Sequence, residues 1–190
     1  MLTRFFEIKV SFLFESLRLV MNLKNNISII FCALWAIGCV ATAQANEDGT
    51  KFRDWRLACR EFAGEDKFCT IIQQLSETEN GEFLAEIALQ PAIAKEQKRV
   101  VLAISTPTNM ALTIQPGYRR TVSGEVKTLT WRTCSQTSCL ASRVLSVEEV
   151  TELKKGRSIL VGYQLAKDTQ PTIFEVSLSG VTAGLSAIGR

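Results

Sequence analysis

The chain has 190 residues, with 22 basic side chains, 19 acidic ones and no histidine. This length allows one domain, or one domain with a small appendage. The absence of histidine excludes Ser–His and Cys–His nucleophilic pairs, and it removes the commonest metal ligand and the usual general base near neutral pH.

Residues 1–45 have the features of an export leader. From Met21, a positively charged segment precedes the apolar run 27–40, and Ala43-Gln44-Ala45 supplies the small residues that signal peptidase reads. We therefore expect a leader with a signal peptide over residues 1–45 and cleavage after Ala45. Translation is expected to start at Met21, and the alternative is a signal peptide with a long n-region that includes residues 1–20. Residues 46–190 would then form a single β domain.

Two other interpretations of the leader are weaker. The apolar run of about 14 residues is shorter than the roughly 20 that a membrane-spanning helix needs, so a retained anchor is disfavoured and no span is expected after cleavage. A lipoprotein signal at Cys39 lacks the usual leucine three residues earlier.

The leader also carries much of the positive charge. It holds four basic and two acidic side chains, which leaves 18 basic and 17 acidic ones in residues 46–190. A nearly neutral domain gives no general electrostatic reason to bind nucleic acid.

Four cysteines remain after the leader: Cys59, Cys69, Cys134 and Cys139. An even number in an exported chain predicts disulfides, and three pairings are possible. The local pairing, Cys59 with Cys69 and Cys134 with Cys139, would close the tips of two hairpins. A four-cysteine zinc site is the alternative, but its spacings are not those of the usual zinc knuckles.

Short alternating segments separated by polar, Gly or Pro turns predict eight or nine strands. Pro91 is expected to end one strand, residues 92–98 to form a loop, and Tyr118-Arg119-Arg120 to form an exposed loop rather than a grip for an anion. The fold class is therefore mainly β, an antiparallel β-sandwich or barrel-like domain. The expected strands cover 52–59, 68–75, 83–89, 99–105, 111–115, 158–165 and 172–178, with a hairpin in 128–144.

The hairpin allows a register to be predicted. If Cys134 lies opposite Cys139, an unbroken ladder places Trp131 opposite Ser142 and Leu129 opposite Val144 on one largely apolar face. The other face would pair Arg132 with Ala141 and Thr130 with Arg143. We expect Trp131 to be substantially buried and the arginines to be exposed.

The clearest predicted helix covers residues 146–156. Ser146 and Glu149 have the spacing of a capping box, Lys154 and Lys155 suit the negative helix end, and Gly156 ends the helix. Val147, Val150 and Leu153 are expected to form its buried stripe. A short, Gly-interrupted C-terminal helix is expected from the spacing of Leu178, Val181, Leu185 and Ile188.

No catalytic, cofactor-binding or metal-binding set is expected. The adjacent Glu148 and Glu149 are interpreted as solvated helix-face charges, and Cys134-x4-Cys139 lacks the two-residue spacing of redox motifs. A general acid–base pair among Glu82, Glu86 and Glu175 is the one enzymatic alternative.

The chain resembles the invasion-associated locus B family of exported bacterial proteins. The resemblance rests on the order of Phe52-x-Asp54-Trp55, Phe68-Cys69, Leu112-Thr113-Ile114, Trp131-x2-Cys134-x4-Cys139-x-Ala141, Leu153-Lys154-Lys155-Gly156 and Val176-Ser177-Leu178-x-Gly180. It implies an envelope protein of the periplasm or cell surface, linked in some host-associated members to entry into host cells, with no catalytic residues to carry over.

The expected function is therefore binding without catalysis or cofactor, to an unknown envelope or host protein. An envelope hydrolase that uses carboxylates, and a periplasmic accessory in envelope maintenance or chaperoning, are the alternatives.

Overall fold

The computed structural model describes residues 47–61, 67–94 and 97–190, which all belong to the compact unit formed by residues 45–190. The expected leader and its cleavage site after Ala45 lie outside the described residues. Within the described residues the fold is mainly antiparallel β, with two sheets and two helices, and this confirms the predicted fold class.

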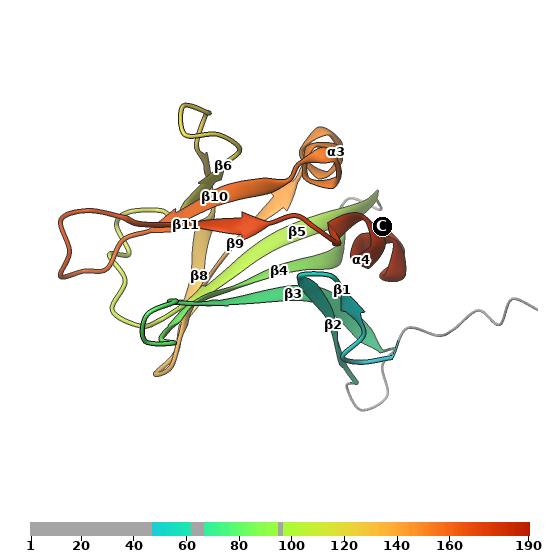
Figure 1. Cartoon of the computed structure of the whole chain (residues 1–190), viewed down its shortest axis with the longest axis horizontal. Helices are drawn as coiled ribbons and strands as arrows, with labels where there is room; N and C mark the ends of the chain where they lie inside the picture. Colours follow the sequence, from blue (N-terminus) through green and yellow to red (C-terminus); the bar gives the residue numbers. More distant parts are fainter. Residues whose placement is uncertain (1–46, 62–66, 95–96) are drawn as a thin grey trace, which may run out of the picture. The chain divides into compact units, whose positions relative to one another are not determined.

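The larger sheet has seven strands (Figure 1). All neighbouring strands in it are antiparallel, and most follow one another in the chain through hairpins. Its strands, in spatial order, are β1 (Lys51–Phe52), β2 (Trp55–Arg60), β3 (Phe68–Ser76), β4 (Phe83–Ala94), β5 (Gln97–Thr106), β9 (Cys139–Leu145) and β8 (Thr130–Cys134).

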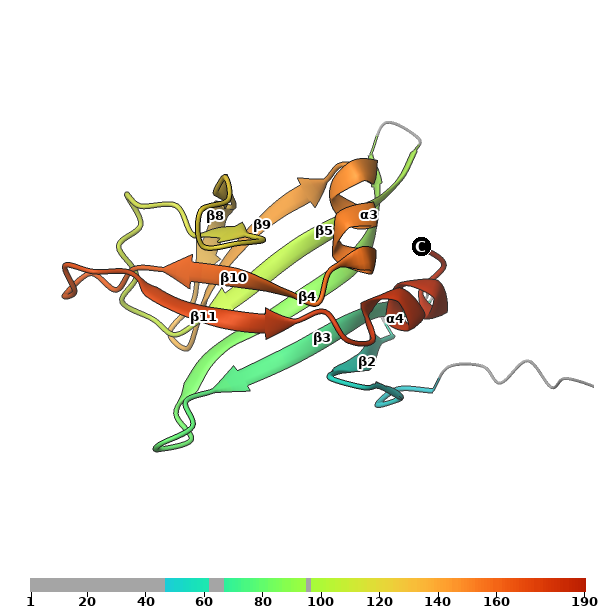
Figure 2. The same ribbon diagram turned by 45° about the horizontal axis from the view of Figure 1, so that its top comes forward.

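The smaller sheet has four strands and crosses over the larger one (Figure 2). Its strands, in spatial order, are β11 (Thr172–Ser177), β10 (Ser158–Tyr163), β6 (Gly117–Arg119) and β7 (Lys127–Thr128). The chain passes from this sheet to the larger one at the buried Leu129, between β7 and β8.

The core fills the space between the sheets. Alternate residues of β2, β4, β5 and β10 are buried, as a sheet covered on one face requires. Two helices, α3 (Val147–Lys155) and α4 (Val181–Ala187), lie at one end of the sheets and add Leu153, Val181 and Leu185 to the same core. The terminal helix therefore forms as predicted.

Each of the four cysteines of residues 46–190 forms a disulfide in the structure. Cys59 bonds Cys69 across β2 and β3, and Cys134 bonds Cys139 across β8 and β9. Because their sulfurs are joined in pairs, these cysteines do not form the alternative zinc site.

The predicted register of the β8–β9 hairpin is wrong beyond its first two pairs. A bulge between Trp131 and Thr133 places Trp131 opposite Ala141 and Thr130 opposite Ser142. A bulge inserts one extra residue into one strand and so reverses the facing of the residues beyond it. Trp131 is half-buried, and its indole N–H donates to the carbonyl of Ile114 at 3.0 Å.

The predicted faces of β9 are also reversed. Arg143 pairs with the buried Leu102 and so lies on the inner face of the larger sheet, whereas Val144 is exposed. Arg132 is exposed as expected. Arg143 points inward because it forms an ion pair with the carboxylate of Glu149 on α3. The alternation of residues within β9 does not reveal this pairing.

Three local predictions were also wrong. Residues 111–115 form a turn rather than a strand, and Tyr118-Arg119 belongs to β6 rather than to a loop, with Tyr118 buried. Strand β4 does not end at Pro91 but continues to Ala94, and β5 begins at Gln97, so the described part of residues 92–98 lies in strands rather than in the expected loop. There β4 pairs with β5 beyond the end of its ladder with β3. Among the described residues Pro91 thus has one strand neighbour, which a residue without an N–H tolerates.

Candidate functional site

The N-terminus of α3 holds one carboxylate in a fixed position. Ser146 is the N-cap: its hydroxyl accepts from the Glu149 N–H at 3.2 Å, and its own N–H donates to Glu149 Oε2 at 2.7 Å. The predicted capping box is therefore present. The predicted buried stripe is only partly correct, because Val147 is exposed and Glu149, rather than Val147, is buried with Leu153.

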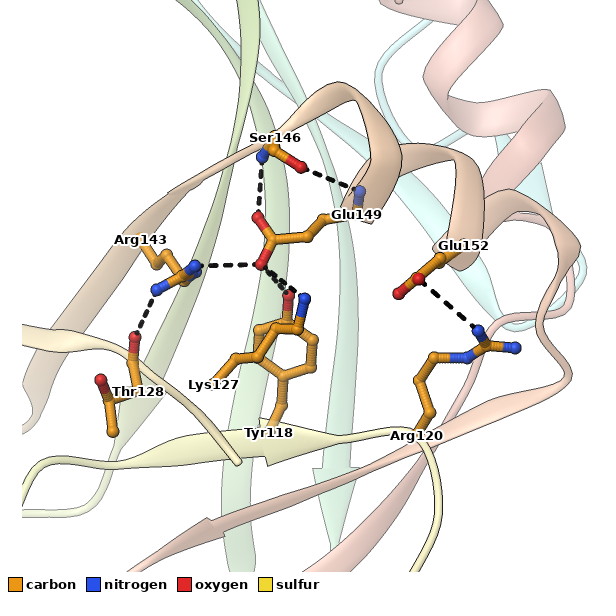
Figure 3. Close-up of polar contacts among 8 residues, drawn as sticks. All are labelled: Tyr118, Arg120, Lys127, Thr128, Arg143, Ser146, Glu149 and Glu152. Atoms are coloured by element: carbon orange, nitrogen blue, oxygen red, sulfur yellow. Dashed lines mark hydrogen bonds and ion pairs between the residues drawn. The ribbon is translucent and has the colours of Figure 1, made fainter. Parts of the chain in front are cut away.

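The second oxygen of Glu149 accepts from three side chains (Figure 3). Tyr118 Oη lies 3.3 Å, Lys127 Nζ 3.2 Å and Arg143 Nη2 3.0 Å from Glu149 Oε1. We call Tyr118, Lys127, Arg143, Ser146 and Glu149 the Glu149 cluster. It joins β6 and β7 of the smaller sheet, β9 of the larger sheet and α3.

The charges in this cluster stabilise one another. Burial alone would raise the pKa of Glu149, but the Ser146 N–H and the cations of Lys127 and Arg143 outweigh it and lower that pKa. Burial, followed by the charge of Glu149, raises the pKa of the Tyr118 phenol. Glu149 is thus an ionised acceptor with both oxygens engaged, and its interpretation as a solvated charge was wrong.

The carboxylates considered for acid–base catalysis do not converge. Glu86 lies on the outer face of the larger sheet, 4.0 Å from Arg56, because its neighbours Ala85 and Ile87 face the core. Glu175 is exposed on β11 of the smaller sheet, whose inward neighbour Val176 is buried. The two glutamates therefore point away from opposite sides of the sandwich.

Glu82 has different surroundings. It is exposed in the β3–β4 turn, where its N–H donates to Asn80 Oδ1 at 2.7 Å. With Glu77 it borders a hollow of about 710 Å³ between this turn and the loops at 107–109 and 165–167. Both carboxylates are exposed, and in the described ranges no three His, Cys, Asp or Glu side chains gather as metal ligands would.

A second hollow, of about 260 Å³, lies on the smaller sheet. Its walls are mostly apolar. Six of the residues that line it are Ile114, Gly117, Val126, Gly162, Pro171 and Ile173. Ile114, Val126 and Ile173 are large apolar side chains with about half of their surface exposed, which marks an interaction surface more strongly than scattered single exposures would.

Two paired glycines make room for this hollow. Gly117 of β6 lies opposite Gly162 of β10, and Gly162 lies opposite Ile173 of β11, so the three form one row on the outer face. A Cβ on Gly117 would lie 2.6 Å from Val126 Cγ1, and one on Gly162 would lie 3.4 Å from Ile173 Cγ1. Val126 therefore lies directly over Gly117, where a larger residue would clash with it, and Ile173 lies against Gly162.

The next row carries opposite charges. Arg119 of β6 lies opposite Leu160 of β10, which lies opposite Glu175 of β11. In the part of the chain that the structure describes, Arg119 and Glu175 have no ion-pair partner, whereas the adjacent Arg120 lies 3.8 Å from Glu152. We call the two rows, Gly117–Gly162–Ile173 and Arg119–Leu160–Glu175, the outer face of the smaller sheet.

The sequence had signals for part of this site. Gly162 interrupts a predicted strand, and a strand glycine often marks a close approach of another group. Arg119 belongs to a basic patch in the sequence, but its neighbours on β10 and β11 come from 40 to 60 residues later, and nothing local indicates that pairing. The second role of Glu149 was missed for the same reason.

Neither helix in the described ranges has the length and hydropathy to cross a bilayer.

Comparisons with known proteins give one family. The family described as invasion associated locus B (IalB) protein matches residues 55–189. No curated protein matches significantly. The crystal structure of invasion associated protein B from Bartonella henselae is similar in fold, with a TM-score of 0.61, 16% identity, and coverage of 73% of this chain and 92% of that one. The family match covers more than half of the sequence, including both disulfides, and the chain therefore belongs to the invasion-associated locus B family.

Proposed function

We propose that this chain is an exported, disulfide-stabilised domain that acts by binding another protein, without catalysis, through the outer face of its smaller sheet. The observation that carries this proposal is the apolar hollow over Gly117 and Gly162, bordered by exposed aliphatic side chains. The family name links such proteins to invasion, and a role in entry into host cells would need an adhesive surface of this kind.

The expected export of this chain supports an envelope or host protein as its partner. The two disulfides suit an oxidising compartment, and the signal expected in residues 1–45 would deliver residues 46–190, as one domain, to the periplasm or cell surface. N-terminal sequencing of the protein from cell fractions tests this part. We expect Asn46 as the first residue, and a protein that retains residues 1–45 would contradict it.

The binding experiment compares two aliphatic residues of equal exposure on different sheets. Ile173 is 50% exposed on β11 and Val144 is 48% exposed on β9. Proteins crosslinked to the mature chain in intact cells should be lost with Ile173→Lys and kept with Val144→Lys. Equal recovery with both variants would remove the outer face from the proposal, and recovery of no specific protein with the wild type would contradict binding.

An envelope hydrolase is the second candidate, and the hollow beside Glu77 and Glu82 is the observation that favours it. The double variant Glu77→Gln/Glu82→Gln tests it against a panel of peptidoglycan, glycan and ester substrates. Turnover by the wild type that is lost in the double variant would replace the binding proposal.

An accessory role in envelope maintenance would use the same binding face. A deletion strain would then be more sensitive to detergent, and Val144→Lys but not Ile173→Lys would rescue it.

A further inference from the structure

We propose that the outer face of the smaller sheet binds a second copy of this chain, in a twofold arrangement whose axis runs along β10. The inference rests on the proposed binding role of that face and names the partner that fits it. The charges, the row positions and the exposed apolar groups of the face carry it.

The charged row is complementary to itself. Arg119 and Glu175 flank Leu160, each one strand away, so about 10 Å separates their Cα atoms at the usual strand spacing. A twofold axis along β10 places β6 of one copy over β11 of the other. Arg119 of each copy then meets Glu175 of its partner, and the two Leu160 side chains meet at the axis. Both charges, which lack an ion-pair partner among the described residues, gain one in the same step.

The glycine row adds an apolar contact under the same axis. Ile173 of each copy lies over the Gly117 end of its partner's row, where the exposed Val126 covers Gly117. The same aliphatic contact thus forms twice in one interface. An isologous contact requires this, because each patch must fit itself. The two sheets would stack with their strands roughly aligned, as in other packed sheets.

The expected association is weak. A stable interface buries about 800 Å² on each partner, more than four such short strands offer. The exposed Ile114 and Val126 at the border of the face would add apolar area. Exposed ion pairs contribute little to affinity, but they fix the register and disfavour like charges. Self-association should therefore depend on concentration and weaken as salt screens the ion pairs.

The test is sedimentation velocity of residues 46–190 from about 1 µM to 1 mM, a range that covers weak dimers. Wild type should shift from monomer to dimer. Arg119→Glu and Glu175→Arg should each weaken the dimer by about tenfold or more, because each places like charges opposite one another twice. Arg132→Glu, at an exposed arginine on the larger sheet, should have no effect.

Mixing the two charge variants gives the decisive result. In a mixed dimer every contact again joins opposite charges, because one copy supplies two glutamates and the other two arginines. The equimolar mixture of Arg119→Glu and Glu175→Arg should therefore dimerise more strongly than either variant alone. Circular dichroism spectra like that of the wild type exclude misfolding as the cause of the single-variant results.

Three outcomes would overturn the inference: a wild type that stays monomeric up to 1 mM, a dimer that both charge variants leave intact, or no recovery in the mixture. If the wild type stays monomeric while Ile173→Lys still abolishes crosslinking in cells, the face binds a different protein, and the binding function stands without self-association. If both experiments fail, the proposed function fails as well.

Discussion

Strand β6 carries two neighbouring residues whose side chains point to opposite faces of the smaller sheet. The inner side chain stabilises the fold, and the outer one belongs to the proposed binding face. Tyr118 points between the sheets and donates to Glu149, whereas Arg119 points out of the smaller sheet and has no ion-pair partner among the described residues. In the Glu149 cluster the carboxylate faces two cations and uses both of its oxygens. Outside, the charges remain available. The ion-paired groups of the cluster hold the fold together, and the outer charges without an ion pair are the ones open to a partner.

The largest expected effect comes from removing the carboxylate of the inner cluster. Glu149→Ala should lower the free energy of unfolding by about 3 kcal/mol, because it leaves Arg143 and Lys127 facing each other without an anion and breaks the capping box. Glu148→Ala, at the fully exposed neighbour on the same helix turn, is the matched control and should change stability much less than Glu149→Ala. Urea denaturation measures both, and equal losses would show that the cluster adds no stability.

The second prediction concerns acid. Since the pKa of Glu149 is lower in the folded state than in the unfolded chain, its contribution is present above the unfolded value of about 4.5 and is lost as pH falls through the folded pKa. Wild type should therefore lose more stability as the pH falls from 5 to 3 than Glu149→Gln, which cannot titrate. Parallel stability curves for the two proteins would contradict the assigned shift.

Removing a single hydroxyl should have a smaller effect. Tyr118→Phe keeps the ring in the core but removes the donor to Glu149, for an expected loss of about 1 kcal/mol at neutral pH. The difference between the two proteins should shrink in alkali. A raised phenol pKa gives stability that is present below about 10 and declines above it, so wild type should fall faster than the variant in that range. Thermal unfolding at pH 7 and pH 10.5 measures both effects.

The smallest effect on stability is expected on the outer face. Arg119→Ala should change the free energy of unfolding by less than about 0.5 kcal/mol, because its side chain has no ion pair to lose among the described residues. The same substitution should weaken crosslinking to the partner. A loss of stability as large as that of Tyr118→Phe would mean that Arg119 supports the fold and would remove the contrast within β6.

Local sequence rules predicted the elements that depend on neighbours in the chain. The capping box of Ser146 and Glu149 formed where its spacing indicated, and Trp55 and Leu57 are buried as their alternation predicted. Cys59 and Cys69 lie opposite each other as a hairpin with a short loop would place them. In each case the interacting groups lie within one helix turn or one hairpin, so the pattern contains both partners.

The predictions that failed depended on remote partners. Arg143 was assigned to the outer face because alternation cannot show that Glu149 lies on the inner side. The segment around Leu112 is apolar enough for a strand, but it forms the turn on which Trp131 packs after the bulge. The bulge itself leaves no clear mark in Trp131-Arg132-Thr133, so the register was wrong beyond the disulfide.

The sequence by itself determined the mainly β class, the four cysteines with their short loops, the capped helix and the family resemblance. Only the tertiary structure decided which charges are satisfied and which face outward. The reason is physical: periodicity reports how one segment divides into two faces, but the sign and distance of a partner across the sandwich depend on how segments 30 to 60 residues apart are paired. The local sequence does not distinguish Arg119 from Arg143. The ion pair with Glu149 makes Arg143 a structural residue, whereas Arg119 has no ion pair among the described residues and is available for binding.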